Sequence, residues 1–150
     1  MKMMVLLDGS KWSQKAAMHA LMLAKKNDEA EVVLFAVLDS SEIKAAAFYL
    51  CMQSDMCDMI GEHEAKILRD LRKNINDDIA DLMLQLNKAG VKCSSKVVTG
   101  KRVEEIVKEF NSDGYNLVVM GAFGKKSNIK VGTLYGDIAK EIDAPILIVN

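Results

Sequence analysis

Short apolar runs alternate with helix-patterned segments along most of the chain, and this alternation limits the possible folds more than any other feature. The apolar runs cover residues 3–7, 31–38, 92–98, 116–120 and 145–149. Segments with apolar residues at three- and four-residue steps cover residues 13–26, 62–88, 103–110 and 133–142. Strands that alternate with helices predict an α/β fold with a parallel sheet covered on both faces. Right-handed crossovers then leave a few doubly wound strand orders.

Composition predicts one domain over residues 1–150. Half of the 150 residues are hydrophobic and the net charge is −1, which together exclude a disordered chain. A balanced charge argues against nucleic-acid binding, which needs a concentrated basic face. No apolar run approaches the ~20 residues that span a bilayer. The apolar run at residues 3–7 is also too short for a secretory signal. We therefore expect no nucleic-acid or membrane partner.

The three cysteines favour a reduced, cytoplasmic setting. Cys51, Cys57 and Cys93 form an odd set without a C-x-x-C pair. On a continuous helix, Cys51 and Cys57 would point to different faces because they are six residues apart. We therefore expect packing roles for these thiols and no metal site.

Residues 39–61 are longer than a strand-to-helix connection requires. They are expected to be partly helical and packed on another element, because they contain Phe48, Tyr49, Leu50, Met52, Met56 and Met59. The three methionines share one helical face, which favours ordinary core packing. A lid or an interaction surface, which adaptable methionine side chains would suit, is the alternative.

Small and polar residues follow the first and fourth apolar runs. In open α/β sheets, ligands bind beyond the carboxyl ends of the strands, where the strand order reverses. If these two strands are neighbours, Asp8 could accept hydrogen bonds from a ribose or a base. Gly121 and Gly124 would admit the ribose and phosphates, and Thr133 would offer a hydroxyl and an N–H group to an anion. Residues 8–10 are equally typical of a turn followed by a helix cap.

Several catalytic patterns are absent from the sequence. It contains neither a P-loop nor a G-x-G-x-x-G dinucleotide fingerprint. Asp8 lacks the acidic neighbours of a phosphoacceptor site, and neither histidine has a sequence partner that would activate a nucleophile. We therefore predict a protein that is not an enzyme. Trp12 either covers the crevice or, as the simpler interpretation, packs on the surface of the first helix.

The residues around this crevice resemble those of the universal stress protein family over essentially the full chain. The shared features are Asp8 after the first strand, a late G-x-x-G at 121–124, Gly132-Thr133, and Pro145 before the final strand. The resemblance implies a Rossmann-like, five-stranded parallel sheet in the order 3-2-1-4-5 with helices on both faces. It also implies homodimers that pair through Ile146–Val149, and a division between ATP-binding and non-binding members.

By matching position, the resemblance also implies contacts to a nucleotide. Asp8 and the backbone of Val37 would contact the base. The ribose and phosphates would lie on Met120, Gly121, Gly124, Gly132, Thr133 and Leu134.

One departure leaves two functions open. Seven residues separate Gly124 from Gly132 where the nucleotide-binding pattern has nine, which shortens the reach of the loop by up to ~7 Å. Its three lysines either compensate by charge or form a solvated loop. The first hypothesis is a small cytoplasmic regulatory protein that binds ATP or a related adenine nucleotide in the crevice between the first and fourth strands. The alternative is a dimeric partner-binding module without nucleotide.

Overall fold

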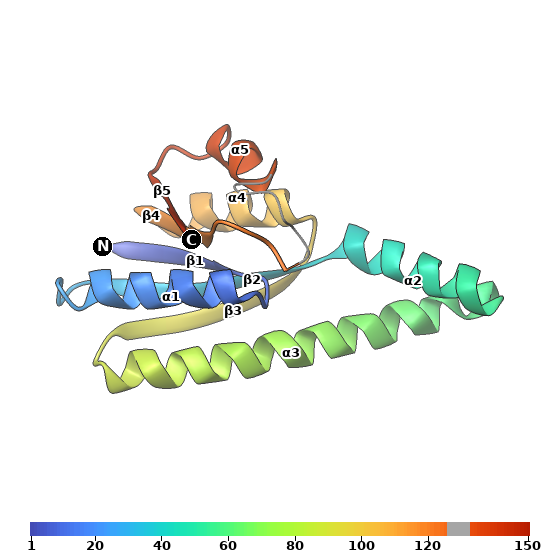
Figure 1. The fold of residues 1–150 in the computed structure, drawn as a ribbon. Coiled ribbons are helices and arrows are strands. Elements are labelled where there is room, and N and C mark those ends of the chain that lie inside the picture. The colour runs from blue at the N-terminus through green and yellow to red at the C-terminus, as the bar shows by residue number, and fades with distance from the viewer. Residues whose placement is uncertain (126–132) are drawn as a thin grey trace.

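The computed structural model describes residues 1–125 and 133–150, and these residues form a five-stranded parallel sheet in the order β3-β2-β1-β4-β5 (Figure 1). The strands are β1 (Lys2–Leu7), β2 (Glu31–Asp39), β3 (Lys92–Gly100), β4 (Leu117–Gly121) and β5 (Ile146–Val149). The helices are α1 (Lys11–Ala24), α2 (Ser40–Ser54), α3 (Ile60–Lys88), α4 (Arg102–Ser112) and α5 (Thr133–Ala139), with a 3-10 turn η1 at Cys57–Met59. The predicted fold class and strand order are confirmed.

Two apolar clusters hold the helices on opposite faces of the sheet. On one face, α1 contributes a stripe of alanines and α3 contributes Ile75, Ile79, Leu82 and Leu86. On the other face, Ile106 and Phe110 of α4 pack with Ile138 of α5. Because successive side chains of a strand point to opposite faces, β1 and β2 supply apolar residues to both clusters. This explains why their sequences are continuously apolar.

The strand order reverses between β1 and β4, which places the carboxyl ends of these strands side by side. β1 pairs with β2 on one side and with β4 on the other, where Met4 lies opposite Val118 and Val5 opposite Val119. β3 and β5 form the two edges of the sheet. Within the described residues, no helix is both long and apolar enough to cross a membrane.

The segment 39–61 folds as predicted in part, but its methionines are not core residues. Residues 40–54 form α2, and Ile43, Ala47 and Cys51 are buried on the side of α2 that packs against α3. Met52, Met56 and Met59 are exposed, so the expectation of ordinary core packing is wrong. The physical reason is visible in Figure 1: α2 and the first half of α3 project beyond the sheet as a hairpin, and α2 makes most of its contacts with α3.

The expectation of three free thiols is also wrong. A disulfide joins Cys51 to Cys57, and their Cα atoms lie 4.6 Å apart. The two residues do not share a continuous helix, because α2 ends at Ser54 and Asp55 adopts a left-handed conformation with φ 55°. That turn brings the chain back toward the last turn of α2. Cys93 remains a free, half-buried cysteine, and burial raises the pKa of its thiol.

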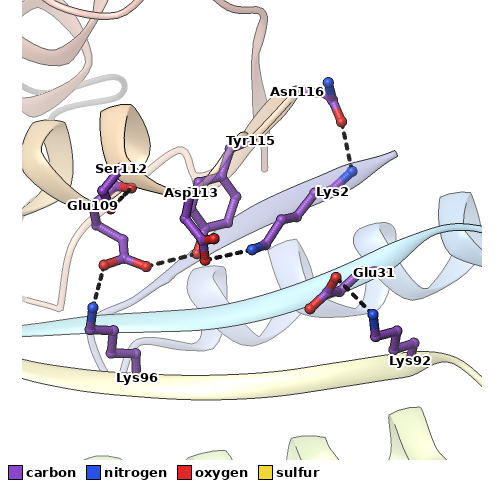
Figure 2. Close-up of polar contacts among 9 residues, drawn as sticks. All are labelled: Lys2, Glu31, Lys92, Lys96, Glu109, Ser112, Asp113, Tyr115 and Asn116. Carbon is purple, nitrogen blue, oxygen red and sulfur yellow. Dashed lines mark hydrogen bonds and ion pairs between the residues drawn. The ribbon is translucent and has the colours of Figure 1, made fainter.

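A buried carboxylate fastens α4 to the sheet (Figure 2). Glu109 of α4 is 7% exposed and accepts hydrogen bonds from the Tyr115 hydroxyl at 3.0 Å and from Lys96 Nζ at 2.5 Å. Both partners therefore have raised pKa values. The hydrogen bond to Glu109 is the main cause for Lys96, and burial followed by the hydrogen bond to Glu109 is the cause for Tyr115.

These two shifts predict a loss of stability in alkaline solution. The ordinary pKa values are 10.0 for tyrosine and 10.5 for lysine. Because the folded-state values are raised, the unfolded chain releases these protons first, so the stabilisation is complete below about pH 10 and is lost progressively above it. We expect urea unfolding to show a falling free energy from pH 10 upward. Glu109→Gln should reduce this dependence, because it removes the main cause of the Lys96 shift and part of the Tyr115 shift. An unchanged slope in that variant would contradict the assignment.

Candidate functional site

A cavity of about 220 Å³ opens at the carboxyl ends of β1, β2 and β4. Its inner part is apolar and consists of Leu6, Phe35, Val37, Ile106 and Met120. All five belong to the apolar cluster beneath α4 and α5. Asp8 and Arg102 supply charged groups of opposite sign to its lining. The cavity therefore combines an apolar interior with charged groups, as small-molecule sites commonly do.

The turn after β1 is a turn followed by a helix cap, which is one of the two predicted interpretations of residues 8–10, and it also borders the cavity. Ser10 caps α1, because its hydroxyl oxygen accepts a hydrogen bond from the N–H of Ser13 at 3.1 Å. Asp8 Oδ1 accepts a hydrogen bond from the N–H of Ser10 at 2.9 Å, and Gly9 between them has φ +81°. Asp8 nevertheless lines the cavity and is exposed. Its carboxylate is therefore held by one backbone contact beside an open space.

Gly121 lies in close contact with α1, and the sequence does not reveal this contact. A Cβ atom at Gly121 would lie 2.7 Å from Trp12 Cβ and 2.8 Å from the Trp12 backbone carbonyl carbon. The missing side chain thus allows the first turn of α1 to approach the end of β4. Gly121 also lines the cavity, but its close contact is with α1.

Trp12 packs beside the cavity and does not line it. Its ring lies 4.9 Å from the ring of Phe123, centroid to centroid, and Phe123 lines the cavity. The ammonium groups of Lys11 and Lys15 each lie 4.8 Å from the centroid of the Trp12 ring. This supports the simpler of the two predictions for Trp12, because the indole covers Phe123 and the start of α1.

The first lysine of the loop after β4 lies over the Asp8–Ser10 turn. A Cβ atom on Gly9 would lie 3.6 Å from Lys125 Nζ and 3.7 Å from Asp78 Oδ2, so both charged groups approach this glycine. Burial raises the pKa of the Asp78 carboxyl, and the Lys125 ammonium opposes that effect. Lys125 therefore places a positive charge beside the turn that carries Asp8.

Arg102 was not predicted as a site residue. It lines the cavity, and its guanidinium donates two hydrogen bonds to Glu42 of α2, at 3.0 and 3.2 Å. The backbone N–H of Arg102 also donates to Asp39 Oδ2 at 3.3 Å, while Asp39 Oδ1 caps α2. The sequence signal that could have identified Arg102 is a basic residue two positions after the carboxyl end of β3. Its pairing with Glu42 of α2 depends on the folded hairpin.

The structure brings most of the predicted site residues together. Six line the cavity: Asp8, Val37, Met120, Gly121, Gly124 and Leu134. Thr133 is the first residue of α5. Gly132 and the rest of the shortened loop from residue 126 onward lie outside the described residues. Among the residues that are described, no group of three His, Cys, Asp or Glu side chains is arranged to hold a metal ion.

An open parallel sheet with a cavity at the point of strand-order reversal defines a Rossmann-like α/β domain. The sequence model of the universal stress protein family matches residues 1–150, and the chain therefore belongs to the universal stress protein family. Universal stress protein MJ0577 of Methanocaldococcus jannaschii is 27% identical over 124 residues, which are 80% of this chain and 76% of that protein. A solved structure of MJ0577 has a TM-score of 0.81 at 25% identity, covering 99% of this chain and 94% of that one.

More distant structures share the fold. Universal stress protein UspA from Lactobacillus plantarum has a TM-score of 0.82 at 15% identity, covering 99% of this chain and 97% of that one. A family member from Arabidopsis thaliana, solved with AMP bound, has a TM-score of 0.59 at 13% identity, covering 99% of this chain and 90% of that one. The sheet and its reversal point are thus common to proteins of low sequence identity.

Proposed function

We propose that the cavity between the ends of β1 and β4 binds ATP or a related adenine nucleotide, and that the protein acts as a regulatory binding module in the cytoplasm without catalysing turnover. The observation that carries this proposal is the cavity itself, with an apolar interior beside the carboxylate of Asp8. A flat adenine ring suits the space beside Val37 and Ile106. The ribose hydroxyls suit the Asp8 carboxylate, which accepts hydrogen bonds only.

The phosphates extend from the ribose toward the segment after β4. Met120, Gly121 and Gly124 supply the backbone next to the ribose, and family resemblance supports phosphate contacts for Gly132, Thr133 and Leu134. Lys125 favours negative charge in the same direction, because its ammonium lies over Gly9. The AMP-bound family member from Arabidopsis thaliana supports the choice of an adenine nucleotide.

Asp8→Asn tests the proposed ribose or base contact. An asparagine oxygen still accepts the hydrogen bond from Ser10, so the turn and the cap of α1 are retained. Loss of the charge should weaken ATP binding by about tenfold, because hydrogen bonds to a charged group contribute about 1.5–3 kcal/mol. Calorimetric titration measures the change. Asp28→Asn, in the turn before β2, is the matched control, and equal affinities for both variants would remove Asp8 from the site.

A second proposal concerns assembly. β5 lies at an edge of the sheet, and its residues Ile146, Leu147 and Ile148 are only partly buried although they are apolar. An exposed edge of this kind favours pairing with another strand. We propose that two copies pair through Ile146–Val149. Sedimentation equilibrium checks this, since a monomer at micromolar concentration would contradict it. A dimer that binds no nucleotide would favour the partner-binding alternative.

A further inference from the structure

The outer face of α2 carries large apolar side chains that nothing within the described residues covers. Phe48, Tyr49 and Met52 are 57%, 62% and 63% exposed. They lie opposite the buried stripe of Ile43, Ala47 and Cys51, because residues three and four apart share a helical face. An amphipathic helix normally places polar residues on its solvent side. This helix is therefore apolar on both faces.

The exposed surface continues around the end of the hairpin. Met56 and Met59 are 48% and 38% exposed and follow directly after α2. The disulfide between Cys51 and Cys57 ties this turn to the last turn of α2, which keeps the two methionines at the same end of the hairpin as Met52. We call the five residues Phe48, Tyr49, Met52, Met56 and Met59 the hairpin tip. In the rest of the described chain, exposed large apolar residues such as Met22 and Leu84 are far apart in sequence and lie on separate helices.

The charge around the hairpin tip is mostly negative. Residues 45–65 contain Asp55, Asp58, Glu62 and Glu64 and no lysine or arginine, and the nearest basic residues in sequence are Lys44 and Lys66 on either side of this range. Within the described residues, none of these four carboxylates forms an ion pair, in contrast to Glu42 at the other end of α2, which pairs with Arg102. The apolar tip therefore has an acidic border.

This charge distribution decides between possible occupants. Pairing of two hairpin tips from two copies of the chain would bring eight carboxylates together with only the flanking Lys44 and Lys66 of each copy to offset them, which is unfavourable. An anionic lipid surface would be repelled in the same way. A segment with an apolar face flanked by lysines and arginines complements both features, and unbranched methionine side chains adapt to such helices.

We propose that the hairpin tip is a docking site for a basic amphipathic helix of a partner protein. The apolar face of that helix packs on Phe48, Tyr49 and Met52, and its cationic side chains lie toward Asp55, Asp58 and Glu62. The disulfide contributes by holding the turn in place before binding, which lowers the ordering cost of the complex. This site lies on the projecting hairpin and does not depend on nucleotide binding.

A designed peptide tests the proposal directly. The probe is a fluorescein-labelled, 18-residue amphipathic helix of leucine and lysine, and its counterpart carries glutamate in place of every lysine. Fluorescence anisotropy should show that the wild-type protein binds the lysine peptide and not the glutamate peptide. The double variant Tyr49→Ser, Met52→Ser should weaken binding by about tenfold or more, as for central residues of an interface. The matched control is Met22→Ser, Leu84→Ser, which removes two similarly exposed side chains elsewhere and should bind as the wild type does.

A charge reversal distinguishes specific docking of the peptide from nonspecific hydrophobic association. Asp58→Lys combined with Glu62→Lys should lose the lysine peptide and gain the glutamate peptide. Equal binding of both peptides by the wild type would overturn the proposal, as would equal losses in the tip and control variants. Binding to phosphatidylcholine vesicles but to neither peptide would identify a lipid surface as the occupant instead. Concentration-dependent self-association that is lost in the Tyr49→Ser, Met52→Ser variant would identify a second copy.

Discussion

Gly121→Ala is expected to lower the free energy of unfolding by about 2–3 kcal/mol, which is a typical cost of forcing an added group into a packed contact. The new Cβ atom would lie 2.7 Å from Trp12 Cβ and 2.8 Å from the Trp12 carbonyl carbon. Neither atom is the far end of a flexible side chain, so the methyl group can be accommodated only by moving α1 away from β4. This movement disturbs the contact between α1 and the sheet, which the alanines of α1 make close.

Urea unfolding followed by circular dichroism measures this effect, and Gly100→Ala is its matched control. A Cβ atom at Gly100 would also meet a neighbour at 2.8 Å, but that neighbour is the side chain of Glu105, which can rotate away. We expect the control to cost less than about 1 kcal/mol. If the two variants were equally stable, close approach of α1 to Gly121 would not be the reason for this glycine.

Val37→Trp is expected to abolish nucleotide binding, with an affinity loss of at least about 100-fold, because the ring occupies the space proposed for the adenine. Val37 lies at the carboxyl end of β2 and lines the cavity together with Ile106 and Met120. A cavity of about 220 Å³ can receive an indole side chain, so the protein should remain folded. Calorimetric titration with ATP measures the loss.

The matched control for this variant is Val98→Trp. Val98 lies opposite Val37 in the register of β2 and β3 and packs against the same apolar cluster, but it does not line the cavity. It therefore receives the same substitution on the same face of the sheet. Unchanged ATP affinity is expected in Val98→Trp, and the nucleotide assignment would fail if Val37→Trp also bound as tightly as the wild type.

The close contact between Gly121 and Trp12 also makes Gly121 a poor position for testing the binding site. The sequence predicted that Gly121 and Gly124 leave room for the ribose and phosphates. A bulky residue at Gly121 would indeed reduce binding, but it would do so by displacing α1, which carries Ser13 in the lining of the cavity. A substitution at Val37 acts on the cavity without touching that contact.

Local pattern was sufficient to predict the framework of this protein. The alternation of short apolar runs with helix-patterned segments indicated a parallel sheet with helices on both faces, and family resemblance supplied the strand order. The same reasoning located the crevice, because Asp8 and Gly121 follow strands that prove to be neighbours. These features depend on residues that are close in sequence or on a regular strand arrangement.

The features that could not be predicted depend on the shape of the projecting hairpin and on its contact with a distant segment. Met52 has the spacing of a core residue, but it is exposed because α2 projects past the sheet and packs only on one side. Cys51 and Cys57 meet because Asp55 adopts a left-handed conformation. Aspartate adopts this conformation only occasionally, so its presence at position 55 does not predict the turn. Arg102 is held at the cavity by Glu42, which lies 60 residues earlier in the chain. Such pairings become visible only in the folded molecule.

Equilibrium dialysis of the wild-type protein against radiolabelled ATP tests the central proposal most directly. If the cavity between β1 and β4 is a nucleotide site, bound ATP should rise with concentration and saturate at one molecule per chain. The shortened loop after Gly124 would then be compatible with binding. If the protein compartment holds no excess of label up to millimolar ATP, the cavity does not bind this nucleotide, and the proposed function is wrong.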